Sequence, residues 1–190
     1  LSSNSLIFLT NNSLGEFTEV RSIGFSGEVK ELRALDVNSN GFIDFVYLQD
    51  GKLEVIWGDS LSTYQNKTTI DLPIPLSNYS IFDYNGDGYN DIAFISQDKH
   101  DLYISFAKST SSFYPSIKYL SSSNLVAINS FVDRSGKKLA ALSSDGKVFV
   151  ISSFLLPDDS YSIAIGQKVT AIQDFDYGND GYKDFCFVDN

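Results

Sequence analysis

The sequence predicts an all-β protein, a β-propeller of four-stranded antiparallel blades with four blades' worth of strands. Three observations lead to this prediction. Apolar runs rich in Phe, Tyr, Val and Ile are interrupted at short intervals by Asn, Asp, Gly and Ser, a pattern typical of strands and turns. A segment rich in Asp, Asn and Gly recurs along the 190 residues. The stretches around this segment repeat as well, in the order expected of a propeller blade.

The recurring segment has nine residues and begins with Asp. Three copies align, namely loop one at 36–44 (DVNSNGFID), loop two at 83–91 (DYNGDGYND) and loop four at 176–184 (DYGNDGYKD). A degenerate copy, loop three, begins at Asp133 (DRSGKK). The first residues of the four loops are separated by 47, 50 and 43 positions, which matches the roughly 40–50 residues of a propeller blade.

Each loop is expected to join the first strand of a blade to the second. The expected first strands are 31–35, 80–82, 125–132 and 169–175, and the expected second strands are 45–48, 92–95, 139–142 and 185–188. The second strands are nearly continuous apolar runs, which predicts burial on both faces, whereas the third strands alternate, as at 53–57 and 102–106. The pairs Asp50-Gly51 and Asp145-Gly146 favour type I′ hairpin turns between second and third strands. A more polar fourth strand completes each blade.

The whole chain, 1–190, is therefore predicted to be one propeller domain or part of one. The expected repeats are approximately 29–75, 76–122 and 123–168, with 1–28 and 169–190 as half blades. Residues 6–9 and 15–17 are expected to begin the third and fourth strands of the first half blade. Two arrangements stay open: a closed four-bladed ring, in which the strand at Leu6 completes the last blade, and part of a larger propeller in a longer chain.

The loops carry the chemistry, because they gather the oxygen ligands that Ca²⁺ prefers. Carboxylate or amide oxygens at loop positions one, three, five and nine, with a backbone carbonyl at position seven, can converge on one ion. Gly at position six permits the left-handed backbone of such a curl. The expected ligands are Asp36, Asn38, Asn40, Phe42 and Asp44 in loop one; Asp83, Asn85, Asp87, Tyr89 and Asp91 in loop two; and Asp176, Asp180, Tyr182 and Asp184 in loop four.

The loops are not expected to bind equally. Loop four has Gly178 at position three and should bind more weakly, and loop three has Lys137 and Lys138 without a carboxylate near position nine. Loop three is therefore expected to hold no metal, with a lysine ammonium there standing in for the cation. Elsewhere the ion is expected to be structural, because several carboxylates in one small loop repel one another without a cation.

The loops have three alternative interpretations. An EF-hand needs a bidentate Glu at position twelve, but that position is Tyr47, Phe94 and Phe187 in the three loops, so the EF-hand is excluded. Mg²⁺ demands stricter octahedral geometry than these loops suggest, which favours Ca²⁺. Plain Asp/Asn/Gly turns without metal stay open as an alternative.

At these loops the chain resembles the FG-GAP/VCBS repeat family, the calcium-loop β-propellers that include the integrin α-subunit head. The segments 11–20 (NNSLGEFTEV) and 57–58 (WG) are similar to the family's outer-strand signatures. No Phe-Gly precedes each loop and no Gly-Ala-Pro follows the second strands, so the shorter VCBS-like class is the closer match. The resemblance implies an extracellular adhesion or ligand-binding role.

Composition narrows the function further. With 14 Lys and Arg against 24 Asp and Glu, the net charge of −10 disfavours a nucleic-acid partner. One His and one Cys exclude a zinc finger and a disulfide scaffold, and no apolar run approaches the roughly 20 residues of a membrane span. We expect an extracellular, calcium-stabilised binding or adhesion module for a protein or glycan ligand. The alternatives are a structural component of a larger assembly and, less favoured because the clustered carboxylates belong to the loops, a carbohydrate-active enzyme domain.

The sequence also predicts the environment of several single residues. Cys186, between two Phe residues, is expected to be a buried, inert thiol, and His100 a solvated turn residue. Trp57 is expected in the core, with stacking on a sugar as the alternative. Glycosylation sequons begin at Asn11, Asn66 and Asn78, about as many as chance gives.

Overall fold

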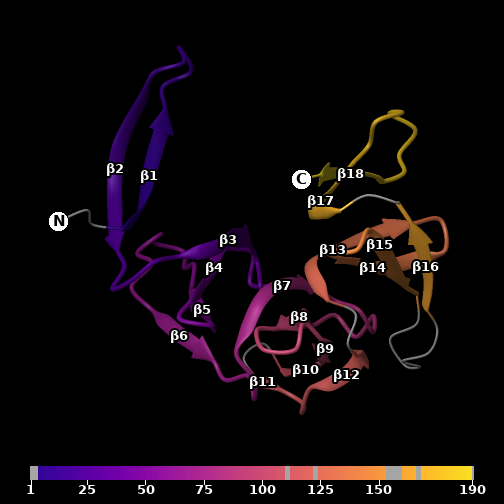
Figure 1. The fold of residues 1–190 in the computed structure, drawn as a ribbon. Helices are drawn as coiled ribbons and strands as arrows, with labels where there is room; N and C mark the ends of the chain where they lie inside the picture. Colours follow the sequence, from indigo (N-terminus) through magenta and orange to yellow (C-terminus); the bar gives the residue numbers. More distant parts are fainter. Residues whose placement is uncertain (1–3, 110–111, 122–123, 153–159, 166–167, 190) are drawn as a thin grey trace.

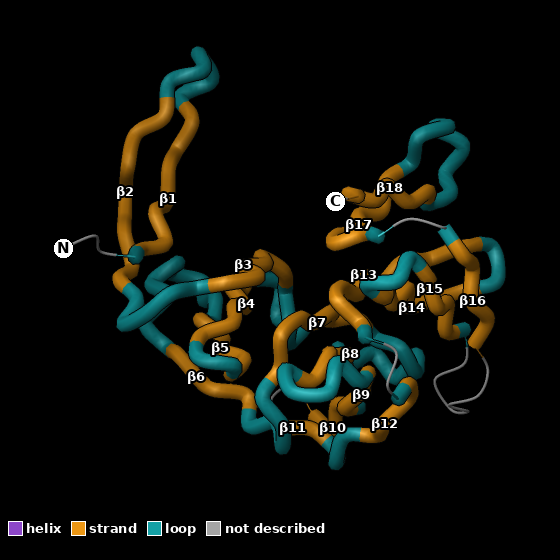
Figure 2. Tube along the Cα trace, viewed as in Figure 1, coloured by secondary structure: helices purple, strands orange, loops and turns teal. Residues whose placement is uncertain are grey.

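A computed structural model describes residues 4–109, 112–121, 124–152, 160–165 and 168–189 of the chain. Its sheets follow one another in sequence order along an open arc (Figure 1). Figure 2 shows that the described residues form strands and loops only. No helix long and apolar enough to cross a membrane occurs in this described part of the chain.

Three complete four-stranded antiparallel sheets form the middle of the arc. Blade A consists of β3 (Lys30–Leu35), β4 (Asp44–Gln49), β5 (Lys52–Ile56) and β6 (Lys67–Ile70). Blade B consists of β7 (Leu76–Phe82), β8 (Asp91–Ser96), β9 (Leu102–Ser105) and β12 (Ile117–Leu120), and blade C of β13 (Leu125–Asp133), β14 (Gly136–Ser143), β15 (Lys147–Ile151) and β16 (Ser160–Ala164). In each blade the strands lie side by side in chain order, as the sequence predicts.

Three two-stranded hairpins complete the described strands. The N-terminal hairpin is β1 (Ser5–Asn11) with β2 (Phe17–Gly24), and the C-terminal hairpin is β17 (Val169–Phe175) with β18 (Asp184–Asp189). A small hairpin of β10 (Ala107–Ser109) and β11 (Ser112–Phe113) lies between β9 and β12. The sequence did not predict it, because strands of three and two residues are too short to show a period of two.

The second strands of the three complete blades are buried on both faces, as their continuous apolar runs predict, whereas in β18 Cys186 and Val188 are exposed. In β8, Ile92 and Phe94 join the apolar cluster with blade A, while Ala93 and Ile95 join the cluster with blade C. All four are 0% exposed. Because neighbouring side chains on a strand point to opposite faces, one run of four residues joins three blades. Burial of each large side chain contributes about 1.5–3 kcal/mol.

The two predicted hairpin turns differ in type. At Asp50-Gly51 both residues are left-handed, with φ of 53° and 72°, which is the predicted type I′ turn. At Asp145-Gly146 only the glycine is left-handed, with φ of 81°, and its N–H donates to the Ser143 carbonyl at 3.1 Å. The predicted type I′ turn is therefore wrong here. The Ser143 hydroxyl contacts Asp145 and accepts the Lys147 N–H at 3.1 Å, which fixes a longer loop.

The two terminal hairpins stay separate in the described structure. β1 pairs with β2 and β18 with β17, and no pairing joins β18 to β1 among the described strands, so the four-bladed closure is not formed. The two hairpins lie at opposite ends of the arc (Figure 1). Phe8 of β1 packs against blade A, with its ring centroid 5.3 Å from that of Phe45. Residue 190, the last of the chain, lies outside the described residues.

The structure shows how exposed Cys186, His100 and the three sequon asparagines are. Cys186 is exposed rather than buried, because β18 is an edge strand that pairs with β17 on one side only among the described strands. His100 is an exposed turn residue, as predicted, with φ of 54°. Among the sequons, Asn11 and Asn66 are exposed, whereas Asn78 is 8% exposed and its side-chain oxygen accepts the Ile128 N–H at 3.3 Å.

Candidate functional site

Loop one curls around the carboxylate at its first position. The Asp36 carboxylate accepts the N–H groups of Asn40 at 3.0 Å and Gly41 at 2.7 Å. The side-chain oxygen of Asn40 accepts the N–H of Phe42 at 2.8 Å. Gly41 has φ of +86°, and the position-six glycines of loops two and four have φ of +89° and +85°, a left-handed conformation that L side chains rarely adopt. The expected glycine-dependent curl is therefore present in all three loops.

The carboxylate at position nine has a structural task that the sequence did not reveal. Asp44 is 0% exposed. One of its oxygens accepts the N–H of Val37 at 2.8 Å, and the other accepts the N–H of Gly58 at 2.7 Å. Asp44 thereby ties the loop and the second strand to the end of the third strand. Burial raises the pKa of its carboxyl group, against the lowering effect of these two hydrogen bonds.

Loop two repeats the arrangement. Asp91 is 0% exposed and accepts the N–H of Tyr84 at 2.9 Å and that of Ala107, just beyond β9, at 2.8 Å. Burial raises the pKa of Asp91 to about 6. Asp83 accepts the N–H groups of Gly86 at 2.7 Å and Gly88 at 3.2 Å. The side-chain amide of Asn85 donates to Asp87 at 2.9 Å.

Loop four has the same curl in a more open setting. Asp176 accepts the N–H groups of Asp180 at 3.0 Å and Gly181 at 2.9 Å, and Tyr182 donates its N–H to Asp180 at 3.0 Å. Asp184 accepts the N–H of Tyr177 at 2.8 Å. Asp184 is exposed, because its sheet contains only two described strands.

Loop three is reduced to a tight hairpin turn. β13 runs to Asp133, which pairs directly with Gly136 of β14, and the hydroxyl and N–H of Ser135 both donate to Asp133 at 2.7 Å. The basic side chains of this turn reach the neighbouring loops. The Lys137 ammonium lies 2.7 Å from an Asp83 oxygen, and the Arg134 guanidinium lies 4.1 Å from the ring centroid of Tyr182. The lysine expected to replace a cation in its own loop is instead paired with loop two.

The loops contact one another in series along one end of the blades. The Asn90 side chain of loop two donates to the carbonyls of Asp36 at 3.1 Å and Val37 at 3.0 Å in loop one. Lys137 of loop three contacts Asp83 of loop two, and Arg134 of loop three contacts Tyr182 of loop four. All four lie at the same end because each connects a first strand to a second.

The loops fit a hard cation in donor chemistry and in backbone curl. Each offers several oxygens and a left-handed glycine, and Asp83 already holds a protein-borne cation, the ammonium of Lys137. Within the described residues, however, no three His, Cys, Asp or Glu side chains converge on one point. The reason is that the carboxylates turn toward backbone N–H groups. A Ca²⁺ ion would share these oxygens, since each carries two lone pairs.

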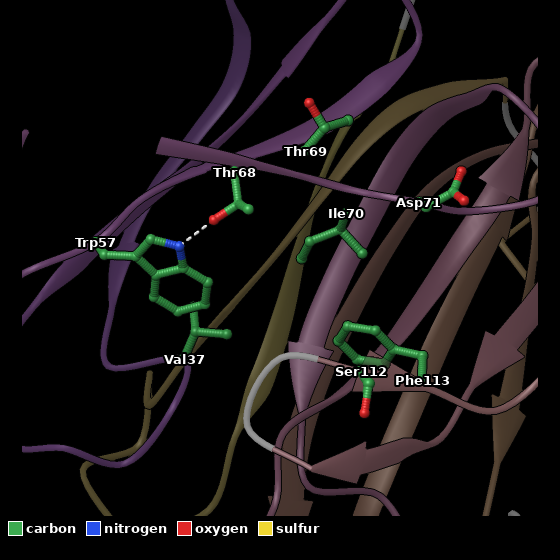
Figure 3. A pocket seen from close by; sticks show the side chains of 8 residues that line it. All are labelled: Val37, Trp57, Thr68, Thr69, Ile70, Asp71, Ser112 and Phe113. Carbon is green, nitrogen blue, oxygen red and sulfur yellow. Dashed lines mark hydrogen bonds between the residues drawn. The ribbon is translucent and has the colours of Figure 1, made fainter. Parts of the chain in front are cut away.

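A pocket lies beside loop one, between blade A and the β10–β11 hairpin. It has a volume of ≈ 290 Å³, with Trp57, Ile70 and Phe113 as apolar walls and Asp71 as an acidic group (Figure 3). The Trp57 indole N–H donates to the Thr68 hydroxyl. Val37, at position two of loop one, also lines the pocket. Trp57 is half-buried: it packs against the apolar cluster between blades A and B, as expected of a core residue, and also forms a wall of the pocket. The sequence did not indicate this pocket, because its walls come from segments more than 40 residues apart.

Comparison with known proteins bears on the fold. No protein-family model matches the chain, and no curated protein matches it. Among 23 solved chains that match is BBS1N, a β-propeller crystallised in complex with ARL6DN and soaked with mercury. The match has a TM-score of 0.64 at 16% sequence identity and covers 96% of this chain. The fold is that of a β-propeller. The chain spans about half of the matched structure, 55% of its length.

Proposed function

We propose that this chain is a calcium-stabilised β-propeller binding module of the FG-GAP/VCBS type, acting outside the cell, without catalytic activity, on a protein ligand. The observation that carries the proposal is the row of similar oxygen-rich loops along one end of the blades, with a pocket directly beside loop one. The shared loop pattern supports the family assignment. The expected localisation follows from that resemblance.

Calcium would be held by the loops that keep the full donor pattern. The ligands would be Asp36, Asn38, Asn40, Phe42 and Asp44 in loop one, Asp83, Asn85, Asp87, Tyr89 and Asp91 in loop two, and Asp176, Asp180, Tyr182 and Asp184 in loop four. The ion would supply positive charge that offsets the repulsion among these carboxylates. It would stabilise the connection between first and second strands, and no chemical step is assigned to it.

The pocket suggests what kind of protein segment is bound. Trp57 and Phe113 offer apolar surface, while Asp71 and the net charge of −10 favour a positively charged neighbour. We therefore propose an extended peptide that places an apolar side chain in the pocket and a Lys or Arg near Asp71. The matched propeller BBS1N was crystallised with a protein, ARL6DN, which supports a protein rather than a glycan as the ligand.

A peptide display library panned on the immobilised protein tests this proposal. Enriched peptides should contain an apolar residue next to Lys or Arg, and enrichment should be lost with Trp57→Ala but not with Tyr114→Ala, an aromatic residue 54% exposed outside the pocket. Fluorescence of Trp57, the single tryptophan, should change on peptide addition. Equal enrichment on the Trp57→Ala variant would exclude the pocket as the site, and selective binding on a glycan array would favour the glycan alternative.

A second candidate function is a structural role in a larger assembly. Both terminal hairpins expose apolar side chains, including Ile7 at 50%, Leu9 at 55% and Val188 at 57%. Such surfaces are typical of protein contacts. If they are covered by further protein, Leu9→Asp and Val188→Asp should abolish assembly, measured by light scattering, and leave the melting temperature unchanged. Monomeric wild-type protein with stable, soluble hairpins would contradict this role.

A further inference from the structure

We propose that Lys137 is a built-in cation of loop two, which Ca²⁺ must displace from Asp83 in order to bind there. Loop two would then bind Ca²⁺ more weakly than loop one, although it has more carboxylates. Metal binding in blade B would also be coupled to the contact with blade C. This inference rests on the proposed calcium function of the loops.

The ammonium of Lys137 is held from two sides. It lies 2.7 Å from an Asp83 oxygen and 5.3 Å from the ring centroid of Phe82. The side chains of Lys137 and Asp83 are only 34% and 20% exposed. A charged hydrogen bond next to an aromatic face, partly shielded from water, is stronger than an ordinary surface ion pair.

The degenerate turn of loop three explains why this lysine reaches a neighbouring blade. Because β13 and β14 are joined by only Arg134 and Ser135, β14 begins at Gly136 and places Lys137 opposite Val132. The side chain then crosses from blade C to the end of β7 in blade B. A nine-residue metal loop in blade C would not start β14 at this point.

Loop one provides the contrast. Among the described residues, no Lys or Arg forms an ion pair with Asp36 or Asp44. The neighbour that contacts loop one is Asn90, whose uncharged amide donates to backbone carbonyls. Loops one and two share the same sequence pattern but have different neighbours. Loop two contacts the ammonium of Lys137, whereas loop one contacts the neutral amide of Asn90.

The competition follows from Coulomb repulsion. An ammonium within a few ångströms of a divalent ion is strongly unfavourable in a partly buried site. Removing the charge of Lys137 should therefore tighten Ca²⁺ binding at loop two by about tenfold or more. In the metal-free protein, the same change should lower stability, because Asp83 loses its partner.

Calcium titration calorimetry on three single variants and one double variant tests the inference. Lys137→Met keeps the aliphatic stem and removes the charge, and Lys137→Arg keeps the charge. Lys147→Met removes a lysine of the same blade whose partner, Asp145, lies outside the metal loops. Lys137→Met should tighten one calcium affinity about tenfold and lower the melting temperature in chelator. Both other variants should match the wild type in calcium affinity, and a further Asp87→Ala change should abolish the tightened site.

A measurement on the wild-type chain covers the case in which Lys137→Met does not fold. The NMR signal of the Lys137 ammonium should shift on saturation with Ca²⁺, whereas the Lys147 signal should not. If the wild type binds Ca²⁺ and neither the Lys137 signal nor the Lys137→Met affinities change, the inference is wrong and the calcium proposal stands. If no calcium binds to any variant, the calcium proposal itself fails and the competition fails with it.

Discussion

The carboxylate of Asp91 accepts the backbone N–H of Ala107 at 2.8 Å, sixteen residues further along the chain. Its other oxygen accepts the N–H of Tyr84 at 2.9 Å. Asp44 makes the corresponding bonds to Gly58 and Val37 in blade A. In blades A and B the last residue of the loop therefore connects three segments, namely the loop, the second strand and the end of the third strand.

The first prediction concerns this connection. Asp91→Ala leaves two buried N–H groups without acceptors, each at a cost of about 1–3 kcal/mol. Urea unfolding in chelator should therefore show a loss of roughly 2–5 kcal/mol. Asp87→Ala is the matched control, since Asp87 is exposed, and in chelator it should cost much less. Equal losses for the two variants would contradict this role of Asp91.

The second prediction concerns metal removal. Chelator should lower the melting temperature and excess Ca²⁺ should restore it, because a ligand at 100 times its Kd stabilises the folded state by about 2.7 kcal/mol per site. Asp83→Ala should remove most of the calcium-dependent stabilisation that comes from loop two and leave unchanged the stabilisation that comes from loop one. Differential scanning calorimetry measures both effects. A melting curve indifferent to chelator would count against structural calcium.

The third prediction concerns pH in the metal-free protein. Burial raises the pKa of Asp91 from 3.8 to about 6, so the folded protein holds this proton more tightly than the unfolded chain does. The stability that comes from this difference in pKa is therefore complete below pH 3.8 and is lost as pH rises through about 6. At about 1.4 kcal/mol per pH unit, the loss is roughly 3 kcal/mol.

The carboxyl carbon signal of Asp91, followed by NMR in chelator, should titrate with a midpoint near pH 6. A midpoint for Asp91 at or below 3.8 would show that its two backbone hydrogen bonds outweigh the cost of burial.

The fourth prediction concerns the contact between blades A and B. The hydroxyl of Tyr79, a residue 0% exposed, lies 2.6 Å from the Glu31 carbonyl and 2.8 Å from the Val46 carbonyl. Tyr79→Phe should lower the free energy of unfolding by about 1–2 kcal/mol, since the buried Val46 carbonyl and the part-buried Glu31 carbonyl lose the O–H donor that they share. Tyr114→Phe, at an exposed position, should change it by less than about 0.5 kcal/mol. Thermal unfolding of both variants measures these changes, and equal losses for the two would contradict the prediction.

Much of the fold could be predicted from the sequence, because propeller blades are assembled from neighbouring segments. The second strands at 45–48 and 92–95 lie inside β4 and β8, since a continuous apolar run records burial on both faces. The left-handed glycine of each full loop, such as Gly41, was also predictable. The type I′ turn at Asp145-Gly146 was not, because the side chain of Ser143 overrides the preference of the pair.

The number of strands, their order within each blade and the position of the oxygen-rich loops can be predicted from the amino-acid sequence. These depend on patterns within a few residues, which the order of side chains records directly. Three features become visible only when the blades are packed together: Lys137 pairs with Asp83, Cys186 is exposed and a pocket forms beside Trp57. The ion pair and the pocket join residues about 50 positions apart, so they depend on which blades are neighbours. The exposure of Cys186 depends on whether another strand covers the edge of its sheet.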